Sequence, residues 1–109
     1  MTKEILREDV KKAIREERAI LVEALPELYY EEGHLPGAIQ INYDEIDSKA
    51  HSSLPDKDAL IITYCASDTC PNSGLAAENL LAVGYTNVRK YVGGKKNWTE
   101  AGEKLELSQ

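Results

Sequence analysis

The sequence has few cysteines, no long apolar segment and no excess of basic residues. Only two of its 109 residues are cysteine, too few for the disulfide framework that holds together many small secreted domains. No apolar stretch approaches the ~20 residues that a membrane-spanning helix needs. The start, Met1–Glu4, is polar and carries an early acidic residue, so we expect no signal peptide. These absences predict a cytoplasmic protein with reduced thiols.

The charge balance of the chain is acidic. Thirteen Lys and Arg residues face nineteen Asp and Glu residues, and the formal net charge is −6. Nucleic acid and anionic membranes repel such a chain, so we expect neither as a partner. The same charge opposes long-range attraction of small anions. Any chemistry on an anion must therefore depend on a locally positive spot.

The apolar pattern predicts one α/β domain over residues 1–109, a length that suits a single compact unit. Five short apolar segments are typical of strands: Ile5–Leu6, Ala19–Val22, Ala38–Ile41, Ala59–Tyr64 and Val88–Val92. Five segments between and after them have helical spacing or helix-start signals: Arg7–Glu17, Glu27–Glu32, Tyr43–Ala50, Ser73–Val83 and Asn97–Glu106. Strands that alternate with helices predict a parallel sheet covered on both faces.

The stretch TYCASDTCPNSG, residues 63–74, contains both cysteines. Cys65 directly follows the most convincing buried strand, and ligands of parallel sheets bind at the carboxyl ends of strands. Asn72 and Ser73 are good helix caps, so the free N–H groups of the next helix should face the loop. This setting favours a thiolate, and we expect a lowered pKa for Cys65.

Other interpretations of the two cysteines stay open. A buried structural thiol is one, above all for Cys70, because Cys is among the most buried residue types. A thiol redox pair of Cys65 and Cys70 is another. A zinc site would need His34 and His51 to converge on a single C-x4-C pair from separate loops, so we expect no metal.

Three segments resemble the rhodanese-like domain family, the single-domain sulfurtransferases, in the family's order and spacing. LVEALPELYYEEGHLPGAIQI (Leu21–Ile41) is similar to the family's first motif, and ALIITYC (Ala59–Cys65) to the strand that delivers its catalytic cysteine. AAENLLAVGYTNVRKYVGG with the following KKNW (Ala76–Trp98) is similar to the closing pattern. The resemblance covers nearly the whole chain. It implies a five-stranded, mostly parallel sheet with helices on both faces.

The resemblance also implies the chemistry. Cys65 would be the catalytic residue and would carry sulfur as a persulfide. A small sulfur-containing anion such as thiosulfate, or a protein persulfide, would donate the sulfur, and cyanide or a thiol would accept it in a second displacement. No cofactor is implied. The active-site loop would bind the substrate through Ala66, Ser67, Asp68, Thr69, Cys70, Pro71, Asn72 and Ser73. A rhodanese-fold sulfur-relay or binding module with little turnover of small molecules is the alternative.

The sequence departs from the family at several points. Glu23 stands where the family often has Asp-x-Arg, and the arginine is missing. The loop after Cys65 is longer than the commonest form, contains Asp68 and has no Lys or Arg. A basic loop residue often recognises thiosulfate in the family, so its absence disfavours thiosulfate as the physiological donor.

Two further positions bear on anion chemistry. Pro71 occupies the place of the arginine in the C-x5-R loops of phosphatases, which argues against phosphatase activity. Lys95 and Lys96 follow Gly93-Gly94, a turn that lies beside the active-site loop in the family fold. They are the candidate anion-binding residues.

Overall fold

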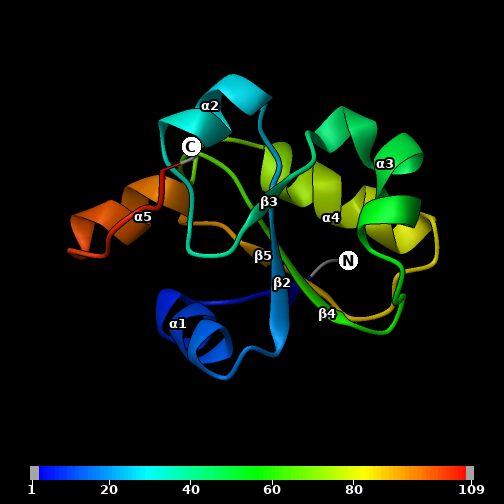
Figure 1. The fold of residues 1–109 in the computed structure, drawn as a ribbon, viewed down its shortest axis with the longest axis horizontal. Helices are drawn as coiled ribbons and strands as arrows, with labels where there is room; N and C mark the ends of the chain where they lie inside the picture. Colours follow the sequence, from blue (N-terminus) through cyan, green and yellow to red (C-terminus); the bar gives the residue numbers. More distant parts are fainter. Residues whose placement is uncertain (1–2, 108–109) are drawn as a thin grey trace.

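A computed structural model describes residues 3–107 and shows one five-stranded sheet (Figure 1). Its strands are β1 (Lys3–Glu4), β2 (Ala19–Glu23), β3 (Ile39–Gln40), β4 (Leu60–Tyr64) and β5 (Val88–Tyr91). They lie in the order β1-β5-β4-β2-β3, and every pairing is parallel. Parallel neighbours need long crossover connections, which the intervening helices supply. The predicted α/β class and five-stranded sheet are confirmed.

Helices cover both faces of the sheet. They are α1 (Arg7–Arg15), α2 (Glu27–Glu32), the 3-10 turn η1 (Tyr43–Glu45), α3 (Ile46–Ser53), α4 (Asn72–Ala82) and α5 (Gly94–Glu100). The buried apolar residues form two clusters, one with α3 and α4 and the other with α1 and α5. Figure 1 shows these pairs on opposite sides of the sheet. None of the helices within residues 3–107 is long and apolar enough to cross a membrane.

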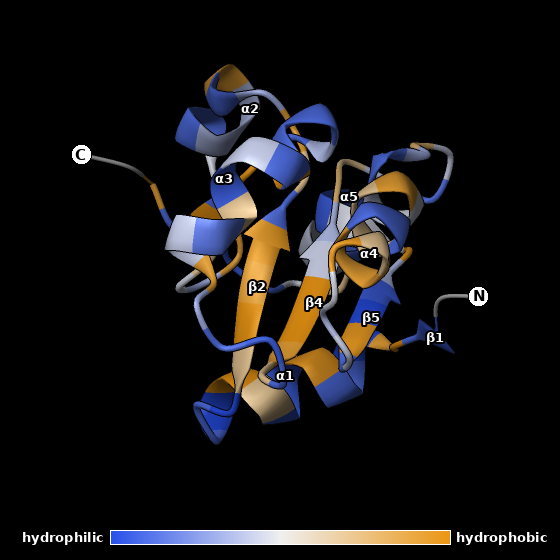
Figure 2. Ribbon diagram, turned by 90° about the vertical axis from the view of Figure 1, so that its right-hand side faces the viewer, coloured by the Kyte–Doolittle hydropathy of each residue, from blue (hydrophilic) through white to orange (hydrophobic). Residues whose placement is uncertain are grey.

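The central strands supply both clusters because successive side chains of a strand point to opposite faces. On β4, Ile61 belongs to the cluster with α4, whereas Ile62 and Tyr64 belong to the cluster with α1. Figure 2 shows β2 and β4 as largely hydrophobic strands, coloured orange, in the middle of the fold. A strand buried on both faces has a continuous apolar sequence, which is why these strands were recognisable.

Three elements differ most from the predicted bounds, and the ends of the others shift by at most two residues. The edge strand lies at Lys3–Glu4 rather than Ile5–Leu6, because an exposed edge pairs through its backbone and needs no apolar side chains. The segment Tyr43–Ala50 is divided between η1 and α3. The last helix is Gly94–Glu100, not Asn97–Glu106. After α5 the chain turns back, and Glu106 forms an antiparallel bridge with His34.

Helix α4 is fastened to the carboxyl ends of two strands. The hydroxyl of the buried Thr63 on β4 donates to the backbone oxygen of Ser73 at 2.8 Å. The Asn72 side chain donates to the backbone oxygen of Ala24, directly after β2, at 3.0 Å. These two bonds fix the first turn of α4, and therefore the end of the preceding loop, against the sheet.

Replacing Thr63 with Val should loosen this attachment. Val has nearly the same shape, so the change removes the hydroxyl donor and leaves the Ser73 carbonyl without it. We expect the free energy of unfolding to fall by about 1–3 kcal/mol. Urea denaturation measures it. Thr99→Val, at an exposed position of α5, is the control and should change stability by less than about 0.5 kcal/mol. Equal effects of the two substitutions would contradict the anchoring role.

Candidate active site

The carboxyl ends of the central strands form one row. Glu23 at the end of β2 is paired in register with Tyr64 of β4, and Tyr64 with Tyr91 of β5. Cys65 is the next residue after this row, at the middle of the sheet edge. The structure thus places the cysteine at the edge where ligands of parallel sheets bind.

The loop after Cys65 folds over the sulfur. Cys65 has no solvent-exposed surface. Its thiol donates to the backbone oxygen of Cys70 at 3.3 Å, and the backbone oxygen of Ser67 lies 3.8 Å from the sulfur. Two backbone carbonyl oxygens therefore face the thiol, whereas we had expected backbone N–H groups there.

The expected low pKa of Cys65 is wrong. Burial, and to a smaller extent the neighbouring Cys70 thiol, raise the pKa of the Cys65 thiol to about 11. The neighbouring Ser73 acts in the opposite direction but does not offset the loss of water. Helix α4 also begins without a side-chain cap, since Pro71 occupies the cap position. Cys65 consequently rests as a protonated thiol.

Cys70 is the more accessible of the two free thiols. It is half-buried and lines a cavity of about 320 Å³ at the start of α4. Asp68, Ser73, Glu78 and Lys90 line the same cavity. The structure therefore excludes the interpretation that Cys70 is packed in the core behind the loop.

The two candidate lysines have different surroundings. The ammonium group of Lys95 lies 2.9 Å from the carboxylate of the buried Glu23 and donates to the backbone oxygen of Tyr29 at 2.7 Å. It is engaged within the protein. Lys96 is exposed and lines a small hollow of about 140 Å³ with Asp68 and Glu100. Lys95 is therefore not placed to attract an anion.

Sequence reasoning missed Lys90, a cation on β5. The ammonium nitrogen of Lys90 would lie 3.7 Å from a Cβ placed at Gly74, in the first turn of α4. The alternation of side chains along β5 could have predicted its position, because Lys90 shares a face of the strand with Val88, and Val88 packs against α4. Lys90 pairs in register with Thr63, two residues before Cys65. That Thr63 is the neighbour of Lys90 follows only from the order of the strands in the sheet.

Glu23 is the centre of a buried polar network. Its carboxylate accepts a hydrogen bond from the Tyr64 hydroxyl at 2.8 Å, and that hydroxyl accepts the backbone N–H of Leu35 at 3.1 Å. Burial raises the pKa of Glu23, and Lys95 and Tyr64 oppose this rise. Lys95 from α5 thus supplies a positive charge in place of the arginine of the family pattern, which this sequence lacks.

The first turn of α5 is bound to the start of the cysteine loop. The backbone N–H groups of Lys95 and Lys96 donate to the backbone oxygens of Cys65 and Ala66 at 3.0 and 2.8 Å. Gly94 has φ of +63°, and a Cβ there would lie 2.4 Å from the Cys65 oxygen. Only glycine permits this approach. The helix end therefore holds the loop rather than leaving its N–H groups for a substrate.

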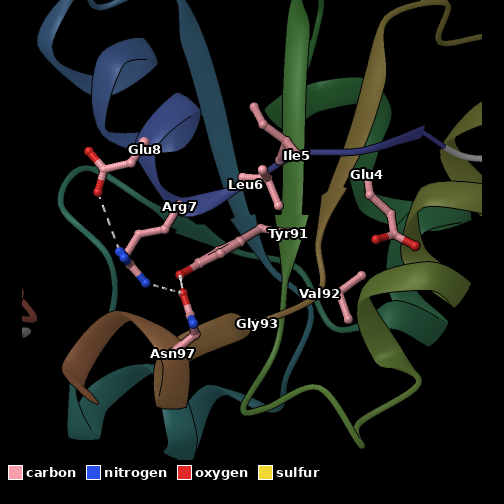
Figure 3. Close-up of a pocket in the computed structure, with 9 residues that line it drawn as sticks. All are labelled: Glu4, Ile5, Leu6, Arg7, Glu8, Tyr91, Val92, Gly93 and Asn97. Atoms are coloured by element: carbon pink, nitrogen blue, oxygen red, sulfur yellow. Dashed lines mark hydrogen bonds and ion pairs between the residues drawn. The ribbon is translucent and has the colours of Figure 1, made fainter. Parts of the chain in front are cut away.

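A second cavity, of about 310 Å³, lies where α1 meets the β5–α5 turn (Figure 3). Three of its polar side chains bind one another: Arg7 donates to the Asn97 amide oxygen at 3.1 Å, and the Tyr91 hydroxyl donates to the same oxygen. No cysteine lines it. Since Arg7, Tyr91 and Asn97 are engaged with one another, we interpret it as a structural junction.

The architecture and the site together define a parallel α/β domain with a cysteine at the centre of its sheet edge. The profile of the rhodanese-like domain family matches residues 6–101. The chain belongs to this family.

Curated relatives agree with this assignment. The chain is 36% identical over 87 residues to adenylyltransferase and sulfurtransferase UBA4 of Candida albicans, a match that covers 74% of this chain and 19% of that protein. It is 37% identical over 73 residues to thiosulfate sulfurtransferase PspE of Escherichia coli, with 67% and 66% covered. The chain thus spans about a fifth of the first relative's length and 66% of the second's.

Solved structures show the same fold. BH2092 protein from Bacillus halodurans superposes with a TM-score of 0.87 at 27% identity, covering 97% of this chain and 77% of that one. The human single-domain sulfurtransferase TSTD1 gives a TM-score of 0.80 at 20% identity, with 92% and 97% covered. At that identity the second likeness concerns the fold alone.

Gly94→Ala tests the contact between α5 and the cysteine loop. An alanine at positive φ costs roughly 1–2 kcal/mol, and the new Cβ would also collide with the Cys65 carbonyl. Gly102→Ala is a matched control, since Gly102 has φ of +87° but no atom within 4 Å of a built Cβ. We expect Gly94→Ala to lower the free energy of unfolding clearly more than the control, as measured by urea denaturation. Equal losses of unfolding free energy in the two variants would show that the close approach of Gly94 to the Cys65 carbonyl does not contribute to stability.

Glu23→Gln tests the buried carboxylate through its pH dependence. Because the pKa of Glu23 is raised above 4.5 in the folded state, that state binds the proton more tightly than the unfolded chain. The wild type should therefore lose stability relative to Glu23→Gln as the pH rises from about 4.5 through the raised folded-state pKa. Urea denaturation across this range measures the difference. Glu32→Gln, at an exposed position of α2, should follow the wild type. A wild type that gains stability over Glu23→Gln with rising pH would contradict the raised pKa.

Proposed function

We propose that this protein is a rhodanese-type sulfurtransferase and that Cys65 carries the transferred sulfur as a persulfide. The observation that supports this most is the position of Cys65, at the carboxyl end of the central strand of a rhodanese-like domain and at the start of the loop that leads to α4. Two curated relatives are named sulfurtransferases. On this proposal residues 1–109 act as one domain, in the cytoplasm, where thiols stay reduced.

The reaction has two displacements at sulfur. In the first, a cysteine thiolate attacks the outer sulfur of a persulfide or thiosulfate donor. The rest of the donor then leaves, as a thiol from a persulfide or as sulfite from thiosulfate. In the second, an acceptor thiol or cyanide attacks the terminal sulfur of the Cys65 persulfide and regenerates the cysteine. Sulfane sulfur moves without net oxidation. Hydrogen bonds from Ser73 would stabilise the negative charge that develops on Cys65.

The surroundings of the loop bear on the choice of donor. Lys95 is paired with Glu23, so it does not supply the cation that thiosulfate recognition needs. The residues from Ala66 to Ser73 would contact the donor, with Cys70 and Ser73 facing the cavity. Lys96 and Lys90 are the basic groups that remain near them. A binding or relay module that exchanges sulfur only with partner proteins is the alternative, and it would show little turnover with small donors.

A thiol redox role is a second candidate, since Cys65 and Cys70 are free cysteines and the Cys65 sulfur lies 3.3 Å from the backbone oxygen of Cys70. Oxidation of such a pair to a disulfide would remove two hydrogens from the protein. Sulfur transfer would instead add one sulfur atom. The two functions therefore predict different masses for the treated protein.

Cys65→Ser provides the direct test. We expect the wild type to gain one sulfur atom after incubation with glutathione persulfide and to transfer it to cyanide or dithiothreitol. Cys65→Ser should fold normally, because serine is close in size, but should lose transfer by at least about 10³-fold. Intact-mass spectrometry and thiocyanate formation measure the two effects. Full transfer by Cys65→Ser would overturn the assignment, and a wild type that only loses two hydrogens would support the redox role.

A further inference from the structure

Cys65 and Cys70 differ in access to solvent. Cys65 has none of its surface exposed, and the backbone of the loop covers its sulfur. Cys70 is half-buried and lines the 320 Å³ cavity at the start of α4. A donor outside the protein therefore meets the sulfur of Cys70 before that of Cys65.

The two cysteines are also in direct contact. The Cys65 thiol donates to the backbone oxygen of Cys70 at 3.3 Å, so the side chain of one cysteine contacts the backbone of the other. A sulfur atom bound to Cys70 would thus lie next to the Cys65 sulfur. Transfer between neighbouring thiols needs no large movement of the loop.

We propose that Cys70 is the receiving thiol of the site: it takes sulfane sulfur from the donor in the cavity and passes it to the buried Cys65. The proposal rests on the proposed sulfurtransferase function and adds a step to it. Cys70 is then a catalytic residue, since it bonds to the transferred atom.

The first step is an exchange with the donor. The Cys70 thiolate attacks the outer sulfur of a persulfide R–S–SH, a Cys70–sulfur bond forms, and the sulfur–sulfur bond of the donor breaks. The donor leaves as RS⁻ and takes up the proton that Cys70 released. The products are the Cys70 persulfide and the thiol RSH, so atoms and electrons balance without an external oxidant.

The second step is the same exchange inside the protein. The Cys65 sulfur attacks the terminal sulfur of the Cys70 persulfide, and Cys70 leaves as a thiolate. The Cys65 proton passes to the departing Cys70 thiolate. Sulfur and proton thus move in opposite directions, and the buried site gains no net charge. This matters because burial raises the pKa of Cys65 to about 11, which disfavours an isolated thiolate there.

The charges of the cavity identify the class of donor. Lys90 contributes one positive charge, whereas Asp68 and Glu78 contribute two negative ones. Such a lining does not favour a compact dianion such as thiosulfate. It is better suited to a persulfide, which carries at most one negative charge at its reacting sulfur. Glutathione persulfide is therefore the probe for the test.

The experiment follows where the sulfur is bound and how fast. Wild type, Cys70→Ser and Cys65→Ser are mixed with glutathione persulfide, quenched by alkylation at successive times and mapped by peptide mass spectrometry. We expect Cys70→Ser to load Cys65 at least about tenfold more slowly than the wild type. Cys65→Ser should accumulate the persulfide on Cys70. The wild type should show it on Cys70 first and on Cys65 later.

A matched control separates the proposed role from general thiol reactivity. Ser53, at the end of α3, is exposed and lies outside the candidate site. In the double variant Cys65→Ser/Ser53→Cys, the receiving thiol at position 70 should load at least about tenfold faster than the introduced thiol. Equal rates would mean that Cys70 reacts only as an accessible thiol, and the proposal would be wrong.

The other possible outcomes distinguish a failure of the Cys70 step from a failure of the sulfurtransferase function. If Cys70→Ser loads Cys65 at the wild-type rate, the receiving step is overturned while the Cys65 persulfide stands. If Cys70→Ser loads slowly but Cys70 never carries sulfur in Cys65→Ser, Cys70 only shapes the loop and the proposal fails. If no variant and no wild-type thiol carries sulfur, the sulfurtransferase function fails as well. Urea denaturation of each variant confirms that the loaded protein is folded.

Discussion

The buried carboxylate of Glu23 connects β2, β4, α2 and α5 beside the cysteine. A carboxylate without water needs partners, because an unpaired buried charge is very costly. Tyr64 supplies a hydroxyl from β4, and Lys95 supplies an ammonium group from the first turn of α5. Through Lys95 the network also reaches α2 at the Tyr29 carbonyl. One charge thus binds a strand end, the residue before Cys65 and two helices into a single arrangement.

This network places the reactive loop and limits its chemistry at the same time. With Lys95 engaged, its backbone and that of Lys96 hold the carbonyls of Cys65 and Ala66. The loop that follows then covers the Cys65 sulfur and leaves Cys70 toward solvent. In the proposed mechanism, burial would protect a persulfide on Cys65 from water, although it makes the Cys65 thiolate costly. The adjoining thiol at Cys70 would then offer both a route for sulfur and a place for the proton.

Much of the fold follows from local sequence patterns. The layers were predicted from two patterns. A strand that is buried on both faces, such as β2 or β4, has a continuous apolar sequence, whereas a helix that is buried on one face, such as α1 or α4, has apolar residues at helical spacing. The position of Cys65 after β4 followed in the same way. The bounds of α5 did not, because its start depends on Gly94 meeting the Cys65 carbonyl, a contact between residues far apart in the chain.

The sequence by itself determined the α/β class, the family resemblance and the cysteine at the strand end, since each is written in neighbouring residues. The tertiary structure alone decided the protonation of Cys65, the pairing of Lys95 with Glu23 and the place of Lys90 beside α4. The physical reason is that the pKa of a thiol depends on how much water and charge the whole fold leaves around it. Which lysine faces the cavity likewise depends on the order of strands, which brings Lys90 next to Thr63 although 27 positions separate them.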